Sequence, residues 1–274
     1  MKTIIVPVDF SPTSDNAVDY ALGLAKETHC SILLFHAFQI PVSMTDTPIV
    51  LVSVEEMQKN ADGRIQELKN LVQQKAGAGV KVYAEAKLGN TVDELENLCN
   101  QIKPFAVVMG TKGESAMERV LFGSTTLTAI RHLTWPVIVV PPGKQYHDIK
   151  KIGFACDLKE VVETTPAKQI CEFVKEVNGE LHVLNIDVSH KPLSGEESEG
   201  SLLLQTMLKD VDPIYHFLND EDIETGINRF ADENSIDLVI AIPKKHKLLE
   251  GLFRKNHTRR LVFESHVPVM CVHE

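Results

Sequence analysis

The chain has 274 residues, of which 43% are hydrophobic and 24% are charged, and its formal net charge is −10. This acidic balance disfavours broad binding to nucleic acid or to an anionic membrane, because such surfaces need surplus Lys and Arg to neutralise phosphate. One local phosphate site stays compatible with it, since backbone amides can hold an anion. The length suits one large domain or two of about 140 residues, each able to bury its own core.

The opening segment, the absence of a long apolar run and the cysteines lead us to expect a cytoplasmic protein. The opening MKTIIVPVDF turns acidic too early for a secretion signal, and no run approaches the ~18 apolar residues of a membrane helix. The five cysteines are scattered and odd in number, without a C-x-x-C pair, so we expect reduced, buried thiols and no structural zinc.

Short, β-branched apolar runs alternate with amphipathic helices through the first half. In chain order we expect a strand over 3–8, a helix over 16–28, a strand over 31–35, a helix over 54–75, a strand over 80–84, a helix over 91–101 capped by Thr91, a strand over 105–109, a helix over 124–133 and a strand over 136–140. This alternation indicates a parallel, doubly wound sheet.

The pattern of the first half begins again after residue 143. The apolar run that ends at Asp157 resembles the run that ends at Asp9, which lies 148 residues earlier. Residues 104–136 align with residues 236–268 at a constant offset of 132. The offset decreases from 148 to 132 because the middle of the second half is shorter than the corresponding part of the first. An internal duplication is therefore predicted, with one domain over 1–143 and another over 149–274.

Polar groups and glycines fall where predicted strands end. Pro7-Val8-Asp9 closes the first strand, His36-Ala37 the second, and Met109-Gly110 the fourth. In an open parallel sheet, ligands bind beyond these carboxyl ends, where the strand order reverses. A carboxylate suits a ribose hydroxyl or a base amino group, and a helix start at Ser124 suits phosphate. The edge thus has the polarity that a nucleotide needs, whereas His36 is predicted to be a packing residue.

The glycine loop identifies the resemblance. Gly110, Gly113 and Gly123-Ser124 fit the pattern G-x2-G-x9-G-[ST] without a mismatch. With the opening run that ends at Asp9, the chain resembles a universal stress protein with two tandem domains. That resemblance implies an α/β fold of two flavodoxin- or Rossmann-like domains, each a five-stranded parallel sheet of order 3-2-1-4-5 with helices on both faces.

The resemblance also implies a cofactor, ATP or another adenine nucleotide, with a Mg²⁺ or Mn²⁺ ion at its phosphates and no metal site made by the protein alone. The residues implied are Pro7, Asp9 and Ala37 beside the adenine and ribose, Met109, Gly110 and Gly113 around the ribose and first phosphates, Gly123, Ser124 and Thr125 at the outer phosphates, and Lys112 as added charge.

The second half departs from this pattern. At the offset of 132, Ile242 replaces Gly110, and Lys245, Lys255 and Asn256 take the other motif positions. We therefore expect nucleotide in the first domain only, and we attribute the motif glycines to a ligand, because the second copy folds without them. The second half instead has a basic cluster, interpreted as a solvated surface or as a side-chain anion site. Its members are Lys244, Lys245, His246, Lys247, Arg254, Lys255, His257, Arg259 and Arg260.

No catalytic constellation is apparent: there is no supported Ser-His-Asp set and no P-loop. The sequence predicts a regulatory or protective nucleotide-binding stress-response protein that is not an enzyme, with at most slow, incidental ATP hydrolysis. The alternatives are a stress module for a non-nucleotide ligand, or a slow ATPase or adenylyl-transfer enzyme. In the family, domains pair through their last strands, which here would join strands 137–140 and 269–272 within the chain as a pseudo-dimer. A homodimer of two chains is compatible with this arrangement.

Overall fold

The computed structural model describes residues 2–40, 53–111, 123–188, 194–243 and 257–273. The first half contains, in chain order, β1 (Thr3–Pro7), α1 (Pro12–Glu27), β2 (Ser31–Phe38), α2 (Val54–Ala76), β3 (Val82–Leu88), α3 (Thr91–Ile102), β4 (Ala106–Gly110), α4 (Ser124–His132) and β5 (Val137–Val140). The second contains β6 (Lys151–Ala155), α5 (Val161–Thr164), α6 (Ala167–Val177), β7 (Glu180–Asp187), α7 (Gly195–Met207), the 3-10 helix η1 (Lys209–Val211), β8 (Ile214–Asn219), α8 (Ile223–Asn234), β9 (Leu238–Ala241), α9 (His257–Glu264) and β10 (Val269–Cys271).

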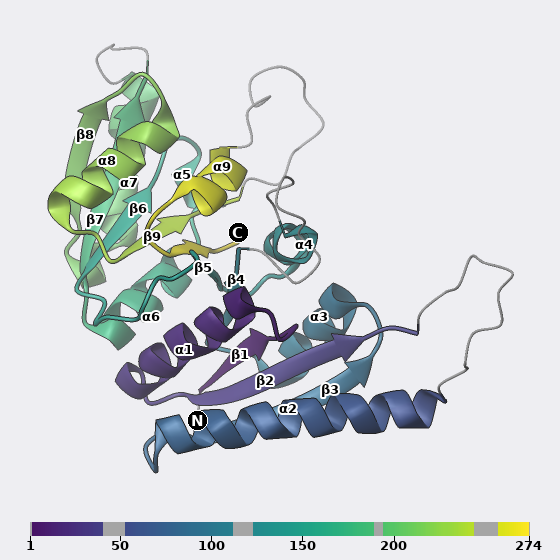
Figure 1. The fold of residues 1–274 in the computed structure, drawn as a ribbon. Helices are drawn as coiled ribbons and strands as arrows, with labels where there is room; N and C mark the ends of the chain where they lie inside the picture. The colour runs from purple at the N-terminus through teal and green to yellow at the C-terminus, as the bar shows by residue number, and fades with distance from the viewer. Residues whose placement is uncertain (1, 41–52, 112–122, 189–193, 244–256, 274) are drawn as a thin grey trace, which may run out of the picture.

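Across the described ranges, the strands form a 10-stranded sheet in the order β3-β2-β1-β4-β5-β10-β9-β6-β7-β8 (Figure 1). Each half contributes the predicted order 3-2-1-4-5 with parallel neighbours, which confirms the α/β fold. The two five-stranded halves form one continuous sheet, because β5 and β10 pair antiparallel, with Met270 opposite Ile138. Their unpaired edges hydrogen-bond to each other, so one sheet runs through both halves.

The strand register repeats between the halves. Ile4 of β1 lies opposite Ala106 of β4, and Ile152 of β6 lies opposite Leu238 of β9. These pairs are related by the same offsets that the sequence shows. The duplication therefore extends from the sequence pattern to the hydrogen-bonded register of the sheet.

Helices cover both faces of the sheet (Figure 1). Buried side chains of α1, α2, α6 and α7 belong to the core on one face, and those of α3, α4, α8 and α9 to the core on the other. Because successive strand side chains point to opposite faces, Met270 of β10 joins the first core and Val269 the second. Each core thus continues from one half into the other.

Two predicted helix starts are corrected by capping. α1 begins at Pro12, before the expected residue 16, because Ser11 accepts the Ser14 N–H at 3.2 Å and proline fits a first helical turn. The cap of α3 is Asn90 and not Thr91, since the Asn90 side chain accepts the Val92 N–H at 2.9 Å.

The cysteines are free thiols, as the sequence predicts. Four are buried, and Cys156 is half-buried at the end of β6. Burial raises the pKa of Cys99 and of Cys271 to about 12, so these thiols stay protonated and unreactive. Within the described ranges, no helix has the length and apolar character needed to cross a bilayer.

Candidate functional site

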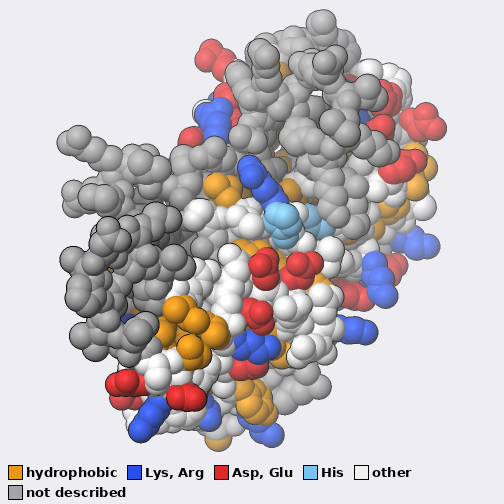
Figure 2. Space-filling view, turned by 90° about the vertical axis from the view of Figure 1, so that its right-hand side faces the viewer, with side chains coloured by type: hydrophobic (Ala, Val, Ile, Leu, Met, Phe, Trp, Pro, Cys, Tyr) orange, Lys and Arg blue, Asp and Glu red, His pale blue; other side chains and the backbone are white. Residues whose placement is uncertain are grey.

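The strand order of the first half reverses between β1 and β4, which are neighbours in the sheet. Pro7 and the buried Val8 lead from β1 to the half-buried Asp9, and Met109 and Gly110 close β4. Figure 2 shows the side of the molecule toward which β2 and β3 point in Figure 1, with acidic and basic side chains interspersed over its described part. The predicted residues of β1 and β4 therefore meet at one topological switch point.

Asp9 shapes the loop that leaves β1. Its Oδ1 accepts the Ser11 N–H at 3.0 Å, and the next residue, Phe10, has a left-handed φ of 64°. The second half repeats this turn, with Asp157 accepting the Lys159 N–H at 3.1 Å and Leu158 at φ 59°. Because the copy without the glycine motif has the same turn, this bond belongs to the fold and not to a ligand.

His36 ties the second strand to the end of the first. Its Nδ1 lies 2.8 Å from the Val8 carbonyl oxygen and must carry the proton to donate to it. In the second half, the Asn185 Nδ2 donates to the Cys156 carbonyl at 3.1 Å in the same place. The geometry agrees with the predicted packing role of His36. Its neighbour Ala37 is half-buried near the carboxyl end of β2.

The packing of α1 against β4 requires a glycine at position 110. A Cβ added to it would lie 2.8 Å from the Thr13 carbonyl oxygen in the first turn of α1. The inference that the fold does not need this glycine is therefore wrong, because α1 approaches β4 too closely for a side chain. In the second half, the half-buried Ile242 stands at the corresponding position and packs against the core.

The N-terminus of α4 is tied to the end of β4. The Gly123 N–H donates to the Thr111 carbonyl at 3.1 Å, and the Thr126 hydroxyl donates to the Gly110 carbonyl at 2.9 Å. Gly123 is the N-cap and offers no side-chain acceptor, while Ser124 is exposed and Thr125 half-buried. The three preceding helices are capped by Ser11, Ser53 and Asn90. Among the described residues, no side chain accepts the first amides of α4, so this helix start is suited to an anion.

Two predicted site residues, Lys112 and Gly113, lie outside the described residues. Sequence reasoning missed Thr126, which directly follows the motif and binds the Gly110 carbonyl. It also missed Thr13, whose contact with Gly110 is made by a carbonyl oxygen, a group that every residue carries. Only Thr126 could have been found from its place in the sequence.

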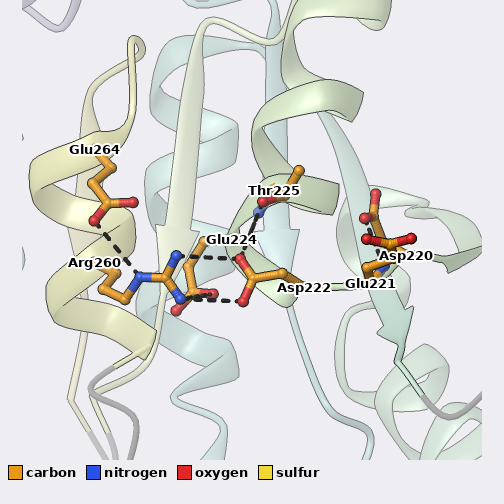
Figure 3. A network of polar contacts seen from close by, with 7 residues as sticks. All are labelled: Asp220, Glu221, Asp222, Glu224, Thr225, Arg260 and Glu264. Atoms are coloured by element: carbon orange, nitrogen blue, oxygen red, sulfur yellow. Dashed lines mark hydrogen bonds and ion pairs between the residues drawn. The ribbon is translucent and has the colours of Figure 1, made fainter.

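A network of charges holds α9 against α8 in the second half (Figure 3). The Arg260 guanidinium lies 3.1 and 3.4 Å from the two carboxylate oxygens of Asp222, 3.3 Å from Glu224 and 3.6 Å from Glu264. Glu224 is 1% exposed, so Arg260 supplies the counter-charge that a buried carboxylate needs. Burial tends to raise the pKa of Asp222, but hydrogen bonds with Glu224, Arg260 and Thr225 lower it overall.

This network changes the interpretation of the basic cluster. Arg260 is not a solvated charge waiting for an anion, because its guanidinium is engaged by carboxylates of α8 and α9. Residues 244–256 of the cluster lie outside the described residues. Arg260 thus acts as a helix-to-helix clamp between α8 and α9.

The fold and the switch-point site define a tandem α/β protein of the flavodoxin-like type. The sequence profile of the Universal stress protein family matches residues 1–141 and again residues 149–273. The chain belongs to the universal stress protein family.

Relatives with known sequences resemble parts of the chain. A universal stress protein of Methanocaldococcus jannaschii is 27% identical over 147 residues, which are 53% of this chain and 84% of the relative. One of Mycolicibacterium smegmatis is 30% identical over 140 residues, 50% of this chain and 47% of the relative. The crystal structure of a universal stress protein from Archaeoglobus fulgidus is similar in fold over 99% of this chain and 98% of its own, with a TM-score of 0.73 at 16% identity.

Proposed function

We propose that the chain binds ATP or another adenine nucleotide at the switch point of its first half. The protein would then have a regulatory or protective role in the stress response. The observation that carries this proposal is the start of α4, which meets the end of β4 and whose first amides are capped by no side chain among the described residues. Such a helix start, beside the end of β4 at Gly110, suits the phosphates of a nucleotide.

The other groups at this edge fit the rest of the ligand. The Asp9 carboxylate accepts hydrogen bonds, as a ribose or base donor requires, and the half-buried Ala37 offers apolar surface. Pro7 and Val8 are buried, so they would contribute through their backbone. The hydroxyls of Ser124 and Thr125 would add to the amides at the outer phosphates. A Mg²⁺ or Mn²⁺ ion would come with the nucleotide and screen its charge.

The second half, in this proposal, takes no nucleotide in the same way. Ile242 stands where the first half has Gly110, and α7 lies so close to the turn after β6 that a Cβ on Gly200 would be 2.0 Å from the Leu158 carbonyl oxygen. We expect this half to act as a partner to the first within one cytoplasmic pseudo-dimer, with or without a further homodimer. We do not expect the protein to act as an enzyme, so any ATP hydrolysis should be slow and incidental.

Native mass spectrometry of protein purified without added nucleotide tests the proposal. Adenine nucleotide retained at one per chain would support it, and Mg-ATP at 100 times its dissociation constant should stabilise the fold by about 2.7 kcal/mol. No retained nucleotide together with no thermal shift on adding Mg-ATP would refute it. Fast steady-state ATP hydrolysis would instead favour the enzyme alternative.

A further inference from the structure

Residues 144–150, which belong to the segment between β5 and β6, run along α1 and are called the strap here. Its Tyr146 ring lies directly on Gly23, where an added Cβ would be 2.3 Å from two ring carbons. Tyr146 also meets Tyr20 edge to face, with ring centroids 5.0 Å apart. A glycine inside a helix lowers helix stability by about 1 kcal/mol relative to alanine. Here the absence of a side chain at Gly23 leaves room for the Tyr146 ring.

Glu27, in the last turn of α1, holds the strap by two hydrogen bonds. Its carboxylate accepts from the Tyr146 hydroxyl and from the backbone N–H of Ile149. Ile149 itself is 1% exposed and belongs to the buried core. The strap is therefore fixed to α1 by ring packing, by hydrogen bonds and by burial.

The far end of the strap is fixed to the second half. The backbone N–H groups of Lys150 and Lys151 both donate to the Asp237 Oδ2, at 2.8 and 2.9 Å. Lys151 opens β6, and Asp237 directly precedes β9. Because one carboxylate binds two successive amides, the end of the strap and the start of the second-half sheet are fixed together.

The opposite end of α1 forms part of the candidate nucleotide site. Its Thr13 carbonyl lies against Gly110, and its Asn16 Nδ2 donates to the Pro141 carbonyl at 3.2 Å, just before the strap begins. α1 continues without a break from Pro12 to Glu27. A shift of α1 at the strap must therefore also move the wall of the site.

Resting on the proposed function, we propose that Tyr146 is a positioning residue for the nucleotide site. Packing of its ring on Gly23 of α1 fixes the position of Thr13 against Gly110. Through the same contact, nucleotide binding in the first half affects β6 and β9 of the second. Coupling of this kind is reciprocal: if the strap helps nucleotide to bind, bound nucleotide must also stabilise the strap.

Isothermal titration of the full chain with Mg-ATP tests the inference in three variants. Tyr146→Ala should weaken binding at least about fivefold, the lower end of typical coupling. Tyr146→Phe, which keeps the ring and loses only the bond to Glu27, should weaken it less. Tyr83→Ala is the matched control, because Tyr83 is 51% exposed on β3 at the edge of the sheet, and it should bind as the unchanged chain does.

Hydrogen exchange supplies a readout that a merely structural role would not change. Mg-ATP should slow exchange of the amides of residues 149–151 in the unchanged chain and should slow it less in Tyr146→Phe. Equal affinity in Tyr146→Ala and in the unchanged chain would overturn the inference while leaving nucleotide binding intact. If Tyr146→Ala does not fold, Tyr146→Phe and Glu27→Gln replace it, and unchanged affinity in both would overturn the inference. An unchanged chain that binds no adenine nucleotide would remove the proposed function, and this inference with it.

Discussion

The two halves share the parts that make the sheet and differ in the parts that cover its carboxyl edge. Both have the strand order 3-2-1-4-5, the aspartate turn with a left-handed residue after it, and a side chain at the end of the second strand that binds the end of the first. These features need no nucleotide, since the copy without the glycine motif keeps them.

The first helix differs most clearly. In the first half, α1 is one helix of 16 residues, with Val18 buried in its interior. In the second half, Pro166 stands at the corresponding position, and the helix is split into α5 and α6. Proline removes a helical hydrogen bond and clashes with the preceding turn. The second half therefore has no single continuous helix that corresponds to α1.

The helix after the second strand differs in length and position. α2 has 23 residues and α7 has 13. The Arg64 side chain of α2 lies over the Phe10 ring at 4.0 Å, whereas the backbone of α7 at Gly200 approaches the Leu158 carbonyl directly. A side chain can move to admit a ligand more readily than a helix backbone can. In the second half, helix backbone therefore fills the space that the Arg64 side chain covers in the first.

The first prediction concerns Gly110 and has the largest expected effect. Gly110→Val should lower the free energy of unfolding by about 1–3 kcal/mol even without nucleotide, because the new side chain would meet the Thr13 carbonyl. Ile242→Val, at the corresponding position of the second half, should cost less than about 1.5 kcal/mol. Urea unfolding measures both. If Gly110→Val lost only nucleotide binding, the glycine would serve the ligand alone.

The second prediction separates the two aspartates. Asp9→Asn should weaken nucleotide binding roughly tenfold, because a hydrogen bond to a charged group contributes about 1.5–3 kcal/mol. Asp157→Asn should leave the affinity unchanged. Both variants keep an oxygen for the turn N–H, so their stabilities should stay close to that of the unchanged chain. Titration with Mg-ATP decides it, and equal losses of affinity in both variants would contradict a site in the first half only.

The third prediction, with the smallest effect, uses a histidine pair found in the second half. His216 Nε2 lies 3.0 Å from His182 Nδ1, and burial, followed by the charge of His182, lowers the pKa of His216 below its usual 6.5. Below pH 6.5 the unfolded chain therefore binds more protons than the folded one, and stability falls until the pH passes the lowered pKa. At the corresponding register position the first half has Glu85.

Urea unfolding at about pH 7.5 and about pH 5.5 measures this loss. His216→Gln should reduce the difference between the two conditions, whereas Glu85→Gln should leave it unchanged. A pH dependence that is the same in His216→Gln and in the unchanged chain would show that the histidine pair is not its source.

Much of the fold could be predicted because strand periodicity and the duplication support each other. The constant offset of 132 placed β4, β5, β9 and β10, and the structure repeats it in the register. Helix starts were less accurate, since a cap depends on which of two neighbours, such as Asn90 and Thr91, turns its side chain toward the helix amides.

The geometry of the candidate site could be predicted only where side chains or glycine spacing indicate it. The end of β1 and the start of α4 followed from Asp9 and from Gly123-Ser124. The reason for Gly110 could not, because its close neighbour is a backbone carbonyl. The clamp at Arg260 was also missed, since a run of basic residues does not show that Asp222 and Glu224 face one of them across two helices.

The stoichiometry of nucleotide binding tests the central claim most directly. Isothermal titration of the full chain with Mg-ATP, at protein concentrations well above the dissociation constant, should give one site per chain. That result would fit a first half in which no described side chain caps the start of α4, and a second half closed by Ile242 and α7. Two equivalent sites per chain, or one site that survives Asp9→Asn and is lost in Asp157→Asn, would contradict the account.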